Sequence, residues 1–214
     1  LAATKENGVW IFPVSGNQPP HFQPGELLRA AYFLPHHTNL LITTARRMDI
    51  WTLPPRTFDH GRSLMLTNPR PIPVTNAAHL EPGSPSADRG RFALPVSARE
   101  IALFGLERKA ETAQLTNALL PGTLSFSANG QWLAAGTFHG SGTRVWNLAT
   151  LQLVKDFNEG NTRVAFSPDG RWLASGGSRL LQVFLTTTWE RVFSKPSETG
   201  SDLPNSVAFA PDAT

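Results

Sequence analysis

The 214 residues contain no cysteine, which excludes disulfides, thiolate metal sites and a cysteine nucleophile. Lys and Arg (19) barely exceed Asp and Glu (16), and no concentrated basic run is present, so nucleic-acid binding is not expected. The 17 glycines and 18 prolines favour turns over long helices, and no apolar run is long enough for a membrane span. No signal-peptide pattern is seen at the start. A cytoplasmic location is favoured, but the absence of cysteine does not fix the compartment.

The first third of the chain is expected to form short antiparallel strands. Residues 1–12 read as the second and third strands of a four-stranded unit, within a partial unit that covers residues 1–20. The next unit, residues 28–66, has apolar alternation at 30–33, 40–44 and 48–53. Because no first strand precedes these two strands, we expect the N-terminal unit to be incomplete.

The third unit covers residues 76–116 and contains an ambiguous segment. Strands are expected at 77–80, 91–97 and 100–104. Residues 106–115 are rich in strong helix formers and would be read as a helix in isolation. The repeat register instead predicts a turn and an outer strand, because residues 148–154 occupy the same place in the following unit.

Two later units, residues 122–157 and 162–194, read as copies of one another. The sequence that begins at Phe126 returns at Phe166, an offset of 40 residues, and a third copy begins a partial unit at 205–214. Each of the two complete copies has a strand, a Ser-x-Asp/Asn-Gly turn, a returning strand and a third strand with an aromatic residue. We expect Trp146 and Phe184, in equivalent places, to be buried between neighbouring units.

These motifs resemble the WD40 β-propeller family, whose blades have four strands and this period. The residues that carry the resemblance are Ser167-Pro-Asp-Gly170, Leu173-Ala-Ser-Gly176 and Val145-Trp-Asn-Leu148. The resemblance implies an all-β propeller segment with about four complete blades and partial blades at both termini. No Gly-His dipeptide precedes these blades, so the family's buried Ser-His-Asp-Trp network is expected to be absent. An excerpt of a larger propeller, with further blades in the parent chain, is favoured over a five-bladed ring closed by its own termini.

The resemblance also implies a place for binding. In this family the turns between second and third strands, and the links between blades, line one rim. These positions hold Lys5, Arg46, Arg47, Arg99, Phe138, His139 and Arg179. The lysine and the four arginines among them outnumber the acids Glu6, Asp49 and Glu100. The rim is therefore expected to favour an acidic peptide or protein surface. Charges dispersed only for solubility are the alternative.

No catalytic residue, metal ligand or cofactor site is indicated. The adjacent His36 and His37 fall on an expected hairpin tip, where neighbouring side chains point apart rather than converge on a metal. Residues 140–142, Gly-Ser-Gly, match neither a nucleophile elbow nor a phosphate loop. The resemblance therefore implies a rigid scaffold for protein interactions, as a regulatory or sensor part of a larger protein. The rival hypothesis is a propeller module of an enzyme, such as the substrate-gating propeller of a peptidase or another hydrolase.

Overall fold

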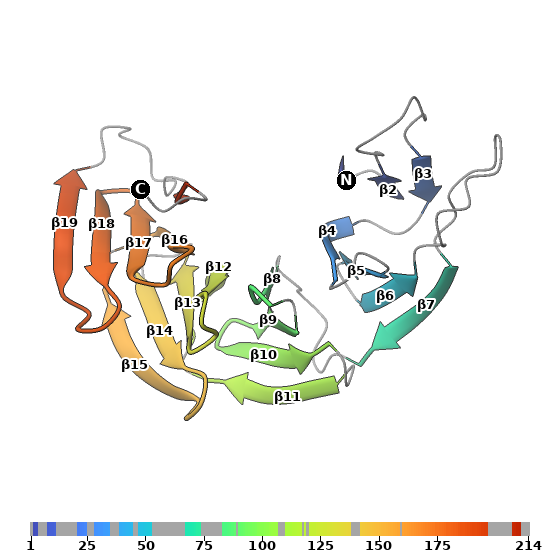
Figure 1. The fold of residues 1–214 in the computed structure, drawn as a ribbon, viewed down its shortest axis with the longest axis horizontal. Coiled ribbons are helices and arrows are strands. Elements are labelled where there is room, and N and C mark those ends of the chain that lie inside the picture. Colours follow the sequence, from blue (N-terminus) through green and yellow to red (C-terminus); the bar gives the residue numbers. More distant parts are fainter. Residues whose placement is uncertain are drawn as a thin grey trace. The chain divides into compact units, whose positions relative to one another are not determined.

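The computed structural model describes most of the chain in two compact units, unit 1 (Leu1–Pro82) and unit 2 (Gly83–Thr214). The described residues are 2–3, 8–11, 21–24, 28–34, 39–44, 47–52, 67–73, 83–88, 90–106, 110–116, 118, 120–137, 142–158, 160–196 and 207–210. They form strands and turns, with no helix among them. Figure 1 shows the strands grouped into separate small sheets.

Unit 1 contains two antiparallel sheets in chain order. Sheet 1 consists of β1 (Ala2–Ala3), β2 (Gly8–Ile11) and β3 (His21–Pro24), and sheet 2 of β4 (Leu28–Phe33), β5 (Asn39–Thr44), β6 (Met48–Thr52) and β7 (Thr67–Ile72). The outer strands β3 and β7 lie beyond the expected limits at residues 20 and 66. Both contain proline and lack apolar alternation, which an outer strand tolerates because one of its edges needs no ladder partner.

Unit 2 contains three four-stranded antiparallel sheets, also in chain order (Figure 1). Sheet 3 is β8 (Ser84–Pro85), β9 (Arg91–Ser97), β10 (Glu100–Gly105) and β11 (Ala110–Leu115). Sheet 4 is β12 (Pro121–Phe126), β13 (Trp132–Thr137), β14 (Thr143–Asn147) and β15 (Gln152–Phe157). Sheet 5 is β16 (Thr162–Phe166), β17 (Trp172–Gly177), β18 (Leu180–Leu185) and β19 (Arg191–Pro196). With sheet 2, these sheets confirm the all-β prediction of about four complete blades.

The ambiguous segment 106–115 ends in a strand, as the repeat register predicts. Strand β11 pairs with β10 along its length, and Leu115 is fully buried. Pairing with a neighbouring strand thus overrides the helix propensity of these residues.

The first strand of sheet 3 differs from the expectation at residues 77–80, which lie outside the described residues. The strand that pairs with β9 is β8, where Pro85 stands opposite Phe92. Phe126 stands in the same way opposite Leu133 in sheet 4, so Pro85 has the place in sheet 3 that Phe126 has in sheet 4. The apolar pattern did not predict this strand, because proline can occupy an edge strand but does not favour strand formation.

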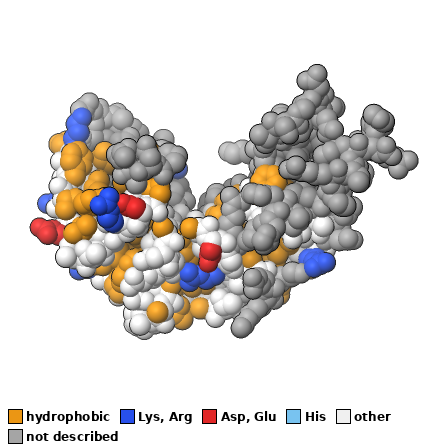
Figure 2. Space-filling view, viewed as in Figure 1, with side chains coloured by type: hydrophobic (Ala, Val, Ile, Leu, Met, Phe, Trp, Pro, Cys, Tyr) orange, Lys and Arg blue, Asp and Glu red, His pale blue; other side chains and the backbone are white. Residues whose placement is uncertain are grey.

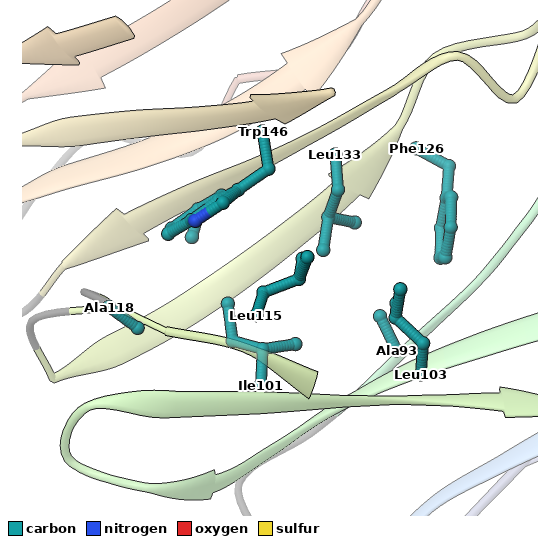
Figure 3. Close-up of a cluster of buried hydrophobic side chains, with 9 residues drawn as sticks. Ala93, Ile101, Leu103, Leu115, Ala118, Phe126, Leu133 and Trp146 are labelled. Carbon is teal, nitrogen blue, oxygen red and sulfur yellow. The ribbon is translucent and has the colours of Figure 1, made fainter. Parts of the chain in front are cut away.

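Sheets 3 and 4 pack through an apolar cluster, called here the 3/4 interface. Ile101, Leu103 and Leu115 of sheet 3 face Leu133 and Trp146 of sheet 4 (Figure 3). The Trp146 side chain is 1% exposed, and its Nε1 donates a hydrogen bond to the carbonyl oxygen of Thr116 at 3.0 Å. The predicted burial of Trp146 between sheets is confirmed.

Sheets 4 and 5 pack through a second cluster, the 4/5 interface. Val145 of sheet 4 contacts the side of sheet 5 that carries Leu173 and Phe184. The rings of Phe157 and Phe184 stack with centroids 4.1 Å apart, and Phe184 is buried as predicted.

The 4/5 interface also contains a buried network of hydroxyl groups. The Thr143 Oγ1 lies 2.8 Å from Ser175 Oγ and donates to Thr162 Oγ1 at 3.1 Å. Thr162 Oγ1 in turn donates to the carbonyl oxygen of Gly142 at 2.8 Å. Hydroxyls from both sheets therefore form the polar contacts of this interface.

Candidate functional site

Turns and links meet at one end of the sheets of unit 2. Leu120 N donates to the carbonyl oxygen of Ala98 at 2.7 Å, which holds the link after β11 against the turn between β9 and β10. Ser178 N donates to the carbonyl oxygen of Asn161 at 3.1 Å, which joins the next link to the turn between β17 and β18. We call this end the rim; its described residues are Ala98, Arg99, Ala118, Leu120, Gly142, Gly160, Asn161, Ser178 and Arg179.

Two of the predicted site residues lie on this rim. Arg99 and Arg179 are exposed and occupy equivalent turns of sheets 3 and 5, with sheet 4 between them. Neither guanidinium has an ion-pair partner within the part of the chain that the structure describes. Both charges are therefore available to solvent or to a ligand.

Arg47 is the one predicted site residue described in unit 1, and its charge is largely offset. Its Nε lies 2.9 Å from Oδ2 of Asp49, whose side chain is only 5% exposed. A buried carboxylate needs such a partner, so this arginine stabilises its own turn between β5 and β6. The other predicted site residues, Lys5, Arg46, Phe138 and His139, lie outside the described residues.

The structure adds an apolar rim residue that the sequence analysis missed. Leu120 is 43% exposed, has a left-handed backbone with φ of 48°, and is held by its hydrogen bond to Ala98, the residue before Arg99. The missed signal was a pair of leucines, Leu119 and Leu120, in a link directly before the first strand of sheet 4. An exposed leucine bonded to the turn that carries the exposed Arg99 gives the rim both an apolar and a cationic contact.

The turns at the opposite end share one hydrogen-bonded design. In sheet 5, Ser167 Oγ donates to Asp169 Oδ1 at 2.6 Å and accepts from the Trp172 N–H at 2.9 Å. The Ser167 hydroxyl, followed by the backbone N–H and the side chain of Arg171, lowers the pKa of Asp169 to about 2. In sheet 3 a bond from Ser86 and the Gly90 N–H likewise lower the pKa of Asp88. These carboxylates are committed to their turns, which makes this end a poorer candidate for binding.

Two further searches concern only the described residues. Within these ranges, no three His, Cys, Asp or Glu side chains come together as a metal-binding group. No helix long and apolar enough to cross a membrane occurs there either.

A family model, the WD domain, G-beta repeat, matches residues 158–184. The matched segment contains the link before sheet 5, strands β16 and β17 and most of β18. The structure describes four four-stranded antiparallel sheets, and this observation adds to the match. Together, the match and these sheets support a WD40-type β-propeller fold. No curated protein matches it.

Among solved structures, hydrazine synthase of Kuenenia stuttgartiensis is similar to this chain. The TM-score is 0.59 at 15% identity, over 79% of this chain and 49% of that one. The chain thus spans about half the length of its neighbour, and at this identity the likeness shows the fold alone. Because 1145 solved chains match, the fold likeness selects no single activity.

The charges on the described surface are mixed. On the face viewed in Figure 2, Lys and Arg atoms are scattered among apolar and uncharged atoms, with acidic atoms next to some of them. The described part of that face shows no continuous basic field. Local arginines, and not a general positive surface, would therefore determine any preference for acidic partners.

Proposed function

We propose that this WD40-type protein binds a protein partner through the rim of unit 2. The observation that carries the proposal is the exposed Leu120, held by a backbone bond to Ala98 in the turn that also carries Arg99. Strands are committed to packing, so loops on this rigid scaffold are where binding residues can be placed. A site fixed by the fold loses little conformational entropy when a partner binds.

The rim favours an acidic peptide segment that also carries an apolar side chain. Leu120 offers an apolar contact, and the arginine beside it can pair with a carboxylate of the partner. Arg179, in the equivalent turn of sheet 5, would steer the same acidic segment and raise the rate of association. By their places in the repeat, Phe138 and His139 are proposed to belong to the same rim, and Lys5, Arg46 and Arg47 to the corresponding turns of unit 1.

The test uses peptides selected against the unaltered protein from a displayed random library. Binding of the selected peptides is then measured on the variants Leu120→Asn and Arg99→Glu. Asparagine tolerates the left-handed backbone of residue 120, so the first variant removes the apolar contact without straining the link. The matched control is Leu151→Asn, because Leu151 is also an exposed leucine, at 38%, with φ of 59°.

Leu151 lies in the turn between β14 and β15, at the opposite end of sheet 4 from the rim. We expect the selected peptides to be enriched in acidic and apolar residues. Each rim variant should weaken their binding by about tenfold, the effect of losing one good contact, while the control binds normally. Peptides that bind both rim variants fully, or that are lost in the control, would place the site elsewhere.

A further inference from the structure

The side chain of Gln182 is fully buried in the 4/5 interface. It lies two residues before Phe184 on the regular strand β18, so both side chains face sheet 4. Gln182 is 0% exposed, and it stands opposite Ser175 of β17. Its Oε1 and Nε2 are both buried, and neither has a hydrogen-bond partner among the described residues.

Hydrogen counting shows that the neighbouring hydroxyl network can accept one more donor. Thr162 donates its hydrogen to Gly142, and Thr143 donates its hydrogen to Thr162. A hydroxyl has one hydrogen, so the contact between Ser175 and Thr143 must have Ser175 as its donor. Ser175 Oγ therefore keeps acceptor capacity on the side chain that stands opposite Gln182.

The equivalent position in sheet 4 holds a longer polar side chain, whose end reaches a partner. Arg144 lies two residues before Trp146, as Gln182 does before Phe184. The arginine is long enough to reach the outer strand, where its Nη2 donates to Asp156 Oδ2 at 2.6 Å. Glutamine is shorter, and its amide stays inside the interface. Buried polar groups in native proteins nearly always have a partner.

We propose that Gln182 and Ser175 bind a buried water molecule between sheets 4 and 5. Water has the required chemistry, because it can donate to Ser175 Oγ and to Gln182 Oε1 while it accepts from Gln182 Nε2. About three such bonds are typical of a buried water molecule. The bound water extends the hydroxyl network of Thr162, Thr143 and Ser175 to the third strand of sheet 5. This site is separate from the proposed binding rim.

The test measures long-lived internal water by relaxation dispersion of water oxygen-17 in solutions of the folded protein. The variant Gln182→Met removes both amide groups at nearly constant side-chain volume. The matched control is Gln152→Met, which alters an exposed glutamine on β15. We expect the dispersion amplitude to fall by the contribution of one long-lived water in Gln182→Met and to stay unchanged in the control.

An unchanged amplitude in a folded Gln182→Met variant would overturn the proposal. If that variant does not fold, a high-resolution crystal structure of the unaltered protein decides. Solvent density within hydrogen-bond distance of both the Gln182 amide and Ser175 Oγ would support the site. An amide bonded only to other groups of the chain would overturn it.

Discussion

The two interfaces between sheets in unit 2 share a register and differ in chemistry. The residue three places before the third-strand aromatic is Ile101 at the 3/4 interface and Thr143 at the 4/5 interface. The second-strand residue facing across is Ala135 in the first case and Ser175 in the second. At these positions the 3/4 interface is therefore closed by apolar contact, whereas the 4/5 interface adds a chain of hydroxyl bonds.

This difference shows that the repeat fixes positions and leaves the chemistry at each position free. Apolar contacts tolerate small shifts of one sheet against another, because they are non-directional. Hydrogen bonds between buried hydroxyls require a defined geometry. We therefore expect the 4/5 interface to hold one alignment more strictly, and the predictions below test this contrast.

The largest effect is expected where both interfaces depend on an aromatic anchor. Trp146→Ala at the 3/4 interface and Phe184→Ala at the 4/5 interface should each reduce the free energy of unfolding by about 3–5 kcal/mol. The reason is the same in both, since each ring is almost fully buried against the neighbouring sheet. Urea denaturation measures the effect. Negligible changes for both variants would contradict the packing of the two interfaces.

The second prediction concerns how closely the sheets approach. A Cβ at Gly136 would collide with the carbonyl oxygen of Thr162 in sheet 5, and the equivalent position of sheet 3 holds the bulkier Pro95. Gly136→Ala should therefore destabilise the protein by about 1–3 kcal/mol through overpacking.

Gly90→Ala is the matched control, because a Cβ there meets only the Asp88 carboxylate at ordinary contact distance, 3.6 Å. We expect this variant to be neutral or slightly more stable, as for other compatible glycine positions. Equal thermal destabilisation of both variants would show that close approach at the 4/5 interface is not the cause.

The third prediction separates directional from non-directional contact. Thr143→Val keeps the side-chain shape but removes the hydroxyl between Ser175 and Thr162, so we expect a loss of about 1–3 kcal/mol from unsatisfied partners. Ile101→Val, the equivalent change at the 3/4 interface, should cost about 0.5–1.5 kcal/mol. A double variant with Ser175→Ala should lose less than the sum of its single variants. Strict additivity would show that the two hydroxyls are not coupled.

Much of the fold could be predicted because local signals agreed with the repeat. The Ser-x-Asp/Asn-Gly turns combine residues that each favour a turn, and Phe126 and Phe166 recur in step with them. The strands β3, β7 and β8 were missed because proline removes the apolar pattern from strands that need few backbone donors. Such strands are determined by pairing with a neighbouring strand, and a short stretch of sequence does not reveal that pairing.

The candidate site was less predictable than the fold. The equivalence of the turns with Arg99 and Arg179 follows from the repeat, whereas the exposure of Leu120 depends on how its link folds back on Ala98. The ion pair between Arg47 and the buried Asp49 likewise depends on the three-dimensional structure. Charges can be counted in a sequence, but their partners cannot.

The smallest effect is expected at the turns that follow the first strands of sheets 4 and 5, where one has an amide and the other a carboxylate. Ser127 donates to the neutral Asn129 in sheet 4 at 2.7 Å, and Ser167 donates to the ionised Asp169 in sheet 5. The pKa of Asp169, about 2, lies below its ordinary value of 3.8, so the carboxylate stabilises the fold above that ordinary value and loses its contribution as the pH falls towards 2.

Asp169→Asn should therefore lose less thermal stability than the unaltered protein as the pH falls from neutrality to about 2, and Asn129→Asp should lose more. Both changes keep the oxygen that accepts from the serine, so the shape of the turn is retained while its charge is altered. Melting temperatures measured across this pH range test the pair. The aspartate is exposed, which makes the expected shifts small. If all three proteins lost stability in parallel, other carboxylates, such as Asp88 in sheet 3, would dominate the response to acid.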